Sequence, residues 1–357
     1  MAGGTWTGTE QKIRPGIYIN FVAAAVAQIT GGARGIVALP VFEYTGTAEV
    51  GKFYTIEGEK EAKEIFGSTG AEPILRVLSG GAKEVLAYAV APIVTPEVDY
   101  NFTTIRDEYE ARDFNVFVYP KEVSTVEQDA AKAWTVRNRT EGKHFLFVVG
   151  GTKAEDQDVS VGNARSVRLK DDYVINLING VILADGTELH SGLYASYIAG
   201  LIAGTAINKA ITYAELPVVD VNKRFKNSEI ESALTSGSLV LVNDGRKVKI
   251  EQGVVTNSDA TKRGKIRAIR ARQAVATDIA YTATDNYIGK LDNNADGQAA
   301  LISAVKAYLE TLEKENVLTK PAVGLDSNYE SVGDSVYLAV SYVETDSMER
   351  IFLTINV

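Results

Sequence analysis

The spacing of apolar and polar positions predicts three successive folded units in this chain. Residues 22–95 carry short apolar runs separated by glycines, with one short helical stretch at 59–66, and this pattern is typical of a small β-rich domain. Residues 97–250 alternate helical stretches with near-continuous apolar strands such as 144–149, as in a central α/β domain whose sheet is covered by helices. Residues 251–345 predict a C-terminal α+β domain, so the expected fold class is α/β, or α+β overall.

The C-terminal domain is expected to contain two helices and a strand. Helical periods cover residues 261–280 and 299–312, and alternation at 336–343 predicts the strand. Both ends of the chain are predicted to be extended arms, the N-terminal arm at residues 1–21 and the C-terminal arm at residues 346–357.

Each arm carries alternating apolar residues that mark one face of a strand. These residues are Ile17, Ile19 and Phe21 in the N-terminal arm and Ile351, Leu353, Ile355 and Val357 in the C-terminal arm. Neither run contains a Lys or Pro that protects a free strand edge, and monomers usually protect such edges. Two outcomes are open at this point: each strand pairs within its own subunit, or it joins a sheet of a neighbouring copy. The second outcome gives head-to-tail contacts, which build rings or helical arrays.

Composition excludes several classes of function. The 357 residues carry a net charge of −9, no cysteine and only two histidines. Disulfides, thiolate metal sites and Cys nucleophiles are therefore excluded, and the acidic balance argues against binding to nucleic acid. The chain starts with Gly- and Thr-rich sequence and has no basic segment followed by an apolar run, so we expect no secretory signal.

The longest uncharged stretch, residues 189–208, is about long enough to cross a bilayer. It contains several polar residues, among them His190 and Asn208, so a buried helix is expected here and no direct insertion into a membrane. Gly200 and Gly204 lie one helical turn apart and allow another element to approach closely.

Two loops match part of a ligand-binding motif. Residues 150–153, Gly-Gly-Thr-Lys, follow a predicted strand, where a phosphate loop is expected, but neither phosphate-loop motif is complete. Residues 292–297 match the first half of an EF-hand loop, but Ser303 stands where the bidentate Glu is required. We interpret both as ordinary loops.

Asp185, His190 and Ser191 are the residue types of a catalytic triad. Their closeness in sequence argues against a triad, because the fold has to set the His between the other two residues. We therefore predict no catalytic residue, no metal site and no cofactor.

One dense basic run covers residues 262–272, and Arg263, Arg267 and Arg270 share a helical face within it. Two interpretations stay open, a solvated helix face and a stripe that docks onto an acidic protein surface. No aromatic residues interleave these charges, which disfavours nucleic acid as the partner.

Several segments resemble the sheath protein of contractile phage tails and phage-tail-like bacteriocins. They are residues 14–19 (RPGIYI), 191–205 (SGLYASYIAGLIAGT), 230–253 with its Asn-Asp-Gly turn, 266–278, and 346–351 (DSMERI). Because these segments run from near the start of the chain to its end, the resemblance covers nearly all of it.

The resemblance implies a structural subunit that lends its terminal strands to neighbours. The lending residues are then Ile17, Ile19 and Phe21 at one end and Ile351, Leu353, Ile355 and Val357 at the other, and the receiving sheet includes Val336, Leu338 and Val340. In this family hexameric rings stack into a helical sheath around an inner tube, and contraction drives the tube through a cell envelope.

The resemblance also implies partners and a location. The partners are other copies of the chain, the tail tube protein, and baseplate and tail-terminator proteins, in a virion tail or bacteriocin particle assembled in the bacterial cytoplasm. A helix near the C-terminus contacts the tube in this family. Residues 261–280 and 299–312 both fit, so Arg263, Arg267 and Arg270 are candidate tube-facing residues.

Two other classes of protein remain as alternatives. One is an α/β enzyme that uses a nucleotide or sugar, and the missing phosphate loop counts against it. The other is a self-assembling shell or surface-array protein, which shares the exposed terminal strands.

Overall fold

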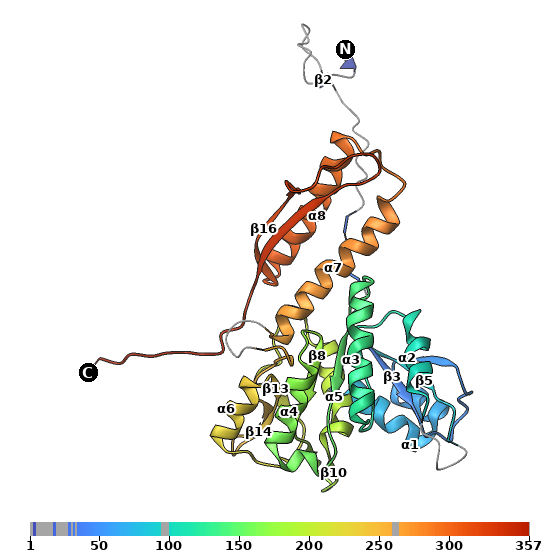
Figure 1. Cartoon of the computed structure of the whole chain (residues 1–357), viewed down its shortest axis with the longest axis vertical. Helices are drawn as coiled ribbons and strands as arrows, with labels where there is room; N and C mark the ends of the chain where they lie inside the picture. The colour runs from blue at the N-terminus through green and yellow to red at the C-terminus, as the bar shows by residue number, and fades with distance from the viewer. Residues whose placement is uncertain are drawn as a thin grey trace.

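The computed structural model describes residues 3–4, 17–18, 28–29, 31–32, 34–93, 100–258 and 264–356. Within these ranges, an α/β body (residues 34–258) carries a C-terminal unit (residues 266–344) of two helices and a two-stranded sheet. Figure 1 shows the body below, the C-terminal unit above it, and one long helix that runs from the first into the second. No helix in the described part of the chain is both long and apolar enough to cross a membrane.

One sheet of seven strands forms the centre of the body, in the order β13-β8-β7-β6-β3-β5-β4. In that order the strands are Ser238–Leu239, Val174–Leu177, Leu146–Val149, Val116–Val118, Ile36–Val41, Glu84–Ala89 and Phe53–Ile56. Neighbouring strands are parallel, except that β4 is antiparallel to β5. Every residue of β6, β7 and β8 is buried, which explains why these strands are apolar except at Asn176 of β8, whose side chain is hydrogen-bonded.

Helices cover both faces of this sheet. Alternate strand residues face two different cores: Leu146 and Val148 pack with α1 (Glu59–Gly80) and α5 (Ser191–Gly204), whereas Phe147 packs with α2 (Phe102–Glu110) and α3 (Thr125–Thr140). The second core is dominated by aromatic rings, and Phe117 and Trp134 lie 5.0 Å apart between centroids in an edge-to-face pair. Near β8 and β13, the sheet is flanked by α4 (Val159–Leu169) and α6 (Asn227–Thr235). The covered α/β sheet is as predicted.

The expected boundary near residue 96 does not separate two sheets. Residues 22–95 were predicted to form a β-rich domain of their own, but β3, β4 and β5 belong to the same sheet as β6, β7 and β8. The reason is α1. Its first segment, up to Gly67, is the helix predicted at 59–66, but a second segment, which was not predicted, continues to Gly80. This longer helical connection allows β5 to pair parallel to β3. Gly67, with φ 71° and ψ 175°, is not helical and forms the kink at which the two segments meet.

The close approach predicted for Gly200 and Gly204 is confirmed. Helix α5 packs directly on α1. A Cβ atom on Gly200 would lie 1.9 Å from the carbonyl oxygen of Val77, and one on Gly204 would lie 1.9 Å from that of Gly81. Only glycine allows the two backbones to lie this close.

Two small sheets complete the body. One contains β10 (Glu188–Leu189), β9 (Val181–Ile182) and β12 (Asp220–Val221), and the other contains β11 (Glu215–Leu216), β15 (Val248–Ile250) and β14 (Leu241–Asn243). Strands β14 and β15 form the hairpin that the Asn243-Asp244-Gly245 turn predicts, with Gly245 at φ 89°.

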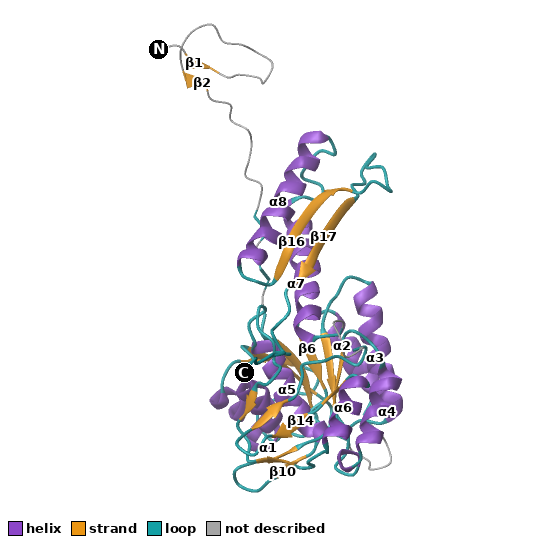
Figure 2. Ribbon diagram, turned by 90° about the vertical axis from the view of Figure 1, so that its left-hand side faces the viewer, coloured by secondary structure: helices purple, strands orange, loops and turns teal. Residues whose placement is uncertain are grey.

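The C-terminal unit consists of α7 (Ile266–Asn286), α8 (Ala295–Lys314), β16 (Leu318–Leu325) and β17 (Leu338–Glu344). Figure 2 shows the antiparallel β16–β17 sheet lying along α8. Val275 of α7, Leu309 of α8 and Leu318 of β16 belong to one apolar core, separate from the cores of the body. Both predicted helices and the predicted strand are present, with shifted ends.

The sequence pattern did not indicate β16, and it predicted a C-terminal strand that the chain does not form alone. Strand β16 contains Lys320, Pro321 and Gly324, residues that are uncommon inside strands, so its sequence does not look like a strand. Its pairing with β17 shifts register between Thr319 and Ala322. Residues 345–356 belong to no strand, and Figure 1 shows the end of this segment as an extended arm. Near the other end, β1 (Gly3–Gly4) and β2 (Ile17–Tyr18) form a short parallel pair.

Candidate assembly interface

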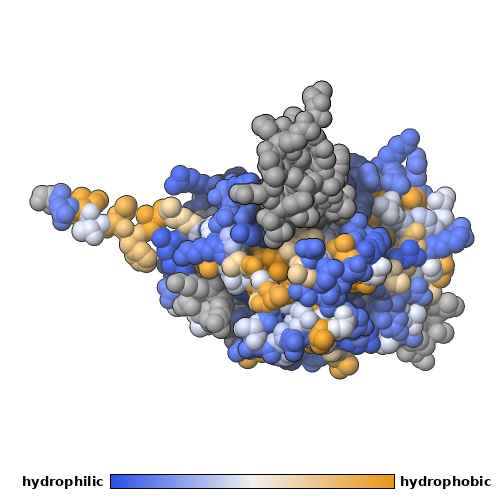
Figure 3. Space-filling view, turned by 90° about the horizontal axis from the view of Figure 1, so that it is seen from above, coloured by the Kyte–Doolittle hydropathy of each residue, from blue (hydrophilic) through white to orange (hydrophobic). Residues whose placement is uncertain are grey.

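The C-terminal arm leaves the molecule as an exposed apolar segment. Every residue from Ile351 to Asn356 is exposed, and Phe352 is 90% exposed and Leu353 79%. Figure 1 shows the arm projecting sideways from the body, and Figure 3 shows that many of its residues are hydrophobic. A contiguous exposed apolar run of this kind marks a contact surface.

The β16–β17 sheet offers edges to which such a segment can add. Among the described residues, neither β16 nor β17 pairs with a further strand, so each has one open edge. The sheet is supported from one side, where Leu338 and Tyr342 pack against the core of the C-terminal unit. Of the predicted receiving residues, Val336 and Leu338 are half-buried and Val340 is 38% exposed.

The base of the C-terminal arm is held by a buried ion pair. The Nζ of Lys265 lies 2.8 Å from a carboxylate oxygen of Glu349, and the two side chains are only 8% and 7% exposed. Thr212 Oγ1 and Gln252 Nε2 donate hydrogen bonds to the same carboxylate at 2.8 and 2.7 Å. Lys265 also pairs with Asp346 at 2.6 Å. Burial opposes ionisation of Glu349, but these hydrogen bonds and the charge of Lys265 outweigh it and lower the pKa of Glu349.

This lowered pKa makes the base of the arm sensitive to acid. A carboxyl group whose folded pKa lies below its ordinary 4.5 contributes stability above that value and loses it as pH falls through the folded pKa. We expect the carboxyl ¹³C resonance of Glu349 in unassembled subunits to titrate with a midpoint below 4.5. In the Lys265→Met variant the midpoint should rise, because the counter-charge and a hydrogen bond are gone. Equal midpoints in the two proteins would contradict the ion pair.

The predicted N-terminal lending residues are only partly covered by the structure. Ile17 lies in β2, opposite Gly3, whereas Ile19 and Phe21 lie outside the described residues, as does Val357 at the other end. After the N-terminal arm, Ile29 is 8% exposed and packs into the core of the C-terminal unit.

The candidate basic stripe makes contacts within the chain. Arg267 is 9% exposed and donates to the carbonyl of Asn316 at 2.9 Å, and Arg270 donates to the carbonyls of Thr205 and Ala206. Burial, and then the neighbouring charge of Arg34, lower the pKa of Arg270 to about 10. Both side chains thus join α7 to other parts of the subunit. Arg263 lies outside the described ranges, and the tube-facing role of the stripe stays a prediction.

The residues of the candidate triad do not assemble as one. The Ser191 hydroxyl donates to Asp156, a fully buried carboxylate that the sequence pattern did not single out. His190 faces the carbonyl of Gly151 through Nδ1 at 2.9 Å and Glu122 through Nε2 at 3.3 Å. These bonds fasten the start of α5 to the end of β7. In the sequence, the only indication of this contact was that Gly150 and Gly151 follow a predicted strand.

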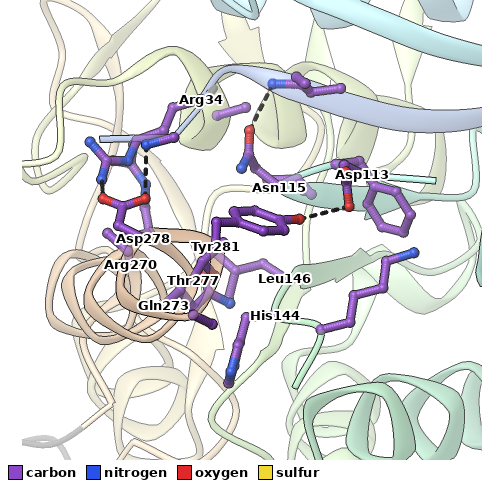
Figure 4. Close-up of a pocket in the computed structure, with 18 of the residues that line it drawn as sticks. Arg34, Asp113, Asn115, His144, Leu146, Arg270, Gln273, Thr277, Asp278 and Tyr281 are labelled. Carbon is purple, nitrogen blue, oxygen red and sulfur yellow. Dashed lines mark hydrogen bonds and ion pairs between the residues drawn. The ribbon is translucent and has the colours of Figure 1, made fainter. Parts of the chain in front are cut away.

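A cavity of about 360 Å³ lies between α7 and the amino ends of β3, β6 and β7. Several of its polar side chains bond within the chain. Figure 4 shows Arg34 paired with Asp278 and the Tyr281 hydroxyl directed at Asp113, to which it donates at 2.8 Å. Lys143 donates to the backbone carbonyls of Tyr109 and Glu110. Nucleotide sites of open α/β sheets lie at the opposite, carboxyl ends of the strands. In the described ranges, no three His, Asp or Glu side chains are grouped so that they could hold a metal.

Comparisons with known proteins agree with the architecture. The model of the phage tail sheath protein central domain matches residues 101–256, and that of the phage tail sheath C-terminal domain matches residues 258–357. The tail sheath protein of Clostridium phage phiCD119 is 24% identical over 88% of this chain and 82% of its own length.

Solved structures share the fold. A sheath tail protein from Desulfitobacterium hafniense superposes with a TM-score of 0.71 at 20% identity, covering 92% of this chain and 100% of that one. The helical sheath of the anti-feeding prophage in its contracted state gives a TM-score of 0.73 at 15% identity, covering 97% of this chain and 99% of that one. The fold is therefore that of a tail sheath protein.

With both of its sheath domains matched, the chain belongs to the phage tail sheath protein family. It is a structural subunit of a contractile tail sheath, as the resemblance of its sequence implied.

Proposed function

We propose that this sheath subunit polymerises by strand exchange. The C-terminal arm of one copy adds to an open edge of the β16–β17 sheet in a neighbour, and the N-terminal arm does the same in another. The observation that carries the proposal is that one chain has both an apolar arm exposed to solvent and a sheet with open edges. Ile351 is 69% exposed and Ile355 79%, and in the described part of the chain β16 and β17 pair only with each other.

One exchanged strand contributes several kcal/mol to the contact between two subunits. An added strand makes about six backbone hydrogen bonds at roughly 0.5–1.5 kcal/mol net each, and burial of the arm's apolar residues adds to this. Each subunit both lends and receives, so the contacts are head-to-tail and extend along the array.

In the assembled particle, hexameric rings stack as a helical sheath around a tail tube and contract to drive the tube through a cell envelope. The partners are the tube, baseplate and terminator proteins, and the location is a virion tail or bacteriocin particle assembled in the bacterial cytoplasm. The role is mechanical, and we assign no catalytic reaction to the chain. The likeness to a contracted helical sheath supports this reading.

Thiol cross-linking tests the exchange directly, because the chain has no cysteine of its own. We combine Leu353→Cys in the arm with Ser341→Cys in β17 or with Thr319→Cys in β16. A short bismaleimide, which tolerates a register difference of a residue or two, should give a ladder of covalent oligomers for the pair on the receiving edge. Each subunit then carries two thiols. The thiol in its arm reacts with the sheet of one neighbour, and the thiol in its sheet reacts with the arm of the other neighbour, so cross-links join many subunits in series.

The single variants Leu353→Cys, Ser341→Cys and Thr319→Cys are the controls, and should give no ladder. If both double variants yield only uncross-linked chains while assembled particles are visible by electron microscopy, the C-terminal arm does not pair with this sheet.

A further inference from the structure

Helix α7 contacts the segment that follows the N-terminal arm, at Gly32 and Arg34, and the residue before α7 contacts the base of the C-terminal arm. Asp278, in the second half of α7, is 3% exposed. Its carboxylate accepts hydrogen bonds from the backbone N–H of Gly32 at 2.8 Å, from the guanidinium of Arg34 at 2.6 Å and from the hydroxyl of Tyr308 in α8. Figure 4 shows Arg34 directed at this carboxylate. One buried charge therefore holds the segment that follows the N-terminal arm against both helices of the C-terminal unit.

The other end of α7 holds the C-terminal arm. Lys265 directly precedes the helix, and its ammonium group lies between the carboxylates of Asp346 and Glu349. After Glu349 the arm is exposed. The last buried attachment of the arm is thus at the start of α7, while β17, the strand that precedes the arm, ends at Glu344.

From these contacts we infer that α7 is a spacer that sets where, and how far apart, the two arms leave the subunit, with Lys265 and Asp278 as its positioning residues. The two residues are 13 positions apart, which corresponds to about 20 Å along a helix. The inference rests on the proposed strand exchange and extends it: the spacer aligns two lent strands with two different neighbours at once.

The physical advantage is a gain in effective concentration. A strand that leaves from a fixed point samples a small volume, so its edge partner meets it at high local concentration. A strand whose base is free samples a larger volume, and more conformational entropy is lost when it pairs. Loosening either base should therefore weaken assembly without removing any residue of the exchanged strands.

The test measures the separation of the two bases in the unassembled fraction of the full chain. Nitroxide labels on Gln28→Cys and Ile351→Cys, both at exposed positions, report a distance distribution by pulsed electron paramagnetic resonance. We expect a narrow distribution for the parent protein. It should become at least twice as broad in Asp278→Asn and in Glu349→Gln, which keep the shape of each side chain and remove its charge.

The same substitutions, made without labels, should raise the protein concentration required for assembly at least tenfold. Arg34→Gln removes a partner of Asp278 that is 32% exposed, and it replaces Asp278→Asn if that variant does not fold. Glu64→Gln, at an exposed ion pair on α1, is the matched control and should change neither measurement.

The outcomes separate this inference from the proposed function. Unchanged distance distributions in the variants overturn the spacer. Broad distributions together with normal assembly also overturn it, and leave strand exchange intact. If the thiol pairs fail to cross-link in the parent protein, strand exchange itself fails, whatever the distances show.

Discussion

Removal of residues 351–357 should abolish sheath assembly and leave the subunit as stable as the full-length chain. Residues 351–356 are exposed and lie beyond Glu349, whose side chain is 7% exposed, so their loss takes little packing from the subunit. In the assembly the same loss removes about six backbone hydrogen bonds per neighbour, or several kcal/mol. Negative-stain electron microscopy should show no cylinders, while the thermal midpoint by circular dichroism stays within about 2 °C, as expected for a change of a few tenths of a kcal/mol.

A substitution series gives this truncation a matched control. Replacing Ile351, Leu353 and Ile355 by Ser removes one apolar face of the arm and keeps its length, and should also prevent assembly. Val126→Ser changes a residue that is 79% exposed on α3 and should assemble normally. Ordinary sheaths from the truncated chain would refute the lending of the C-terminal strand.

Replacing Gly200 by Ala should strongly destabilise the body. The new Cβ would lie 1.9 Å from the carbonyl oxygen of Val77 and 2.8 Å from its carbonyl carbon, both backbone atoms of α1. The two helices must separate to relieve this clash, so we expect a loss of about 3 kcal/mol or more, at the upper end of the range for overpacking. Urea unfolding followed by circular dichroism measures the change.

Gly58→Ala is the control for this variant. Gly58 precedes α1, and no atom lies within 4 Å of the position its Cβ would take. The expected change is below about 1 kcal/mol, in keeping with substitutions in open space. Similar unfolding midpoints for Gly200→Ala and the parent chain would show that α1 and α5 are not in backbone contact.

Local patterns predicted the elements whose neighbours lie nearby in sequence. The buried strands of the central sheet, the β14–β15 hairpin and the glycine contact face of α5 all follow from period, turn residues or residue size. The helix predicted at 59–66 ends correctly at the kink of Gly67, but its continuation was missed because Gly70 looks like a turn residue, although it is buried within the second segment of α1.

The anchors of the arms could not be found from local patterns. Asp278 bonds to Gly32 across 246 positions, and Lys265 bonds to Asp346 across 81. Nothing in the residues around a lone Asp or Lys indicates such a partner, since the fold alone brings the groups together.

The C-terminal strand shows that a correct local pattern can still fail to predict the structure of a single chain. Its alternation is correct for a strand, but a strand requires a partner, and the described part of this chain offers it none.

The connection from Glu344 to Glu349 has a consequence for how tension passes through a sheath. Its first end is tied to the C-terminal unit, through Arg272 on Glu344 and the Thr345 amide on Val317, and its last end is tied to the body through Glu349. In the proposed strand exchange, a pull on the arm by a neighbour therefore reaches Glu349 first, and passes from it to Thr212 and Gln252, next to the β11–β15–β14 sheet of the body, and to Lys265 at the start of α7. The body and the start of α7 would then share this load before it reaches β17, the strand that precedes the arm.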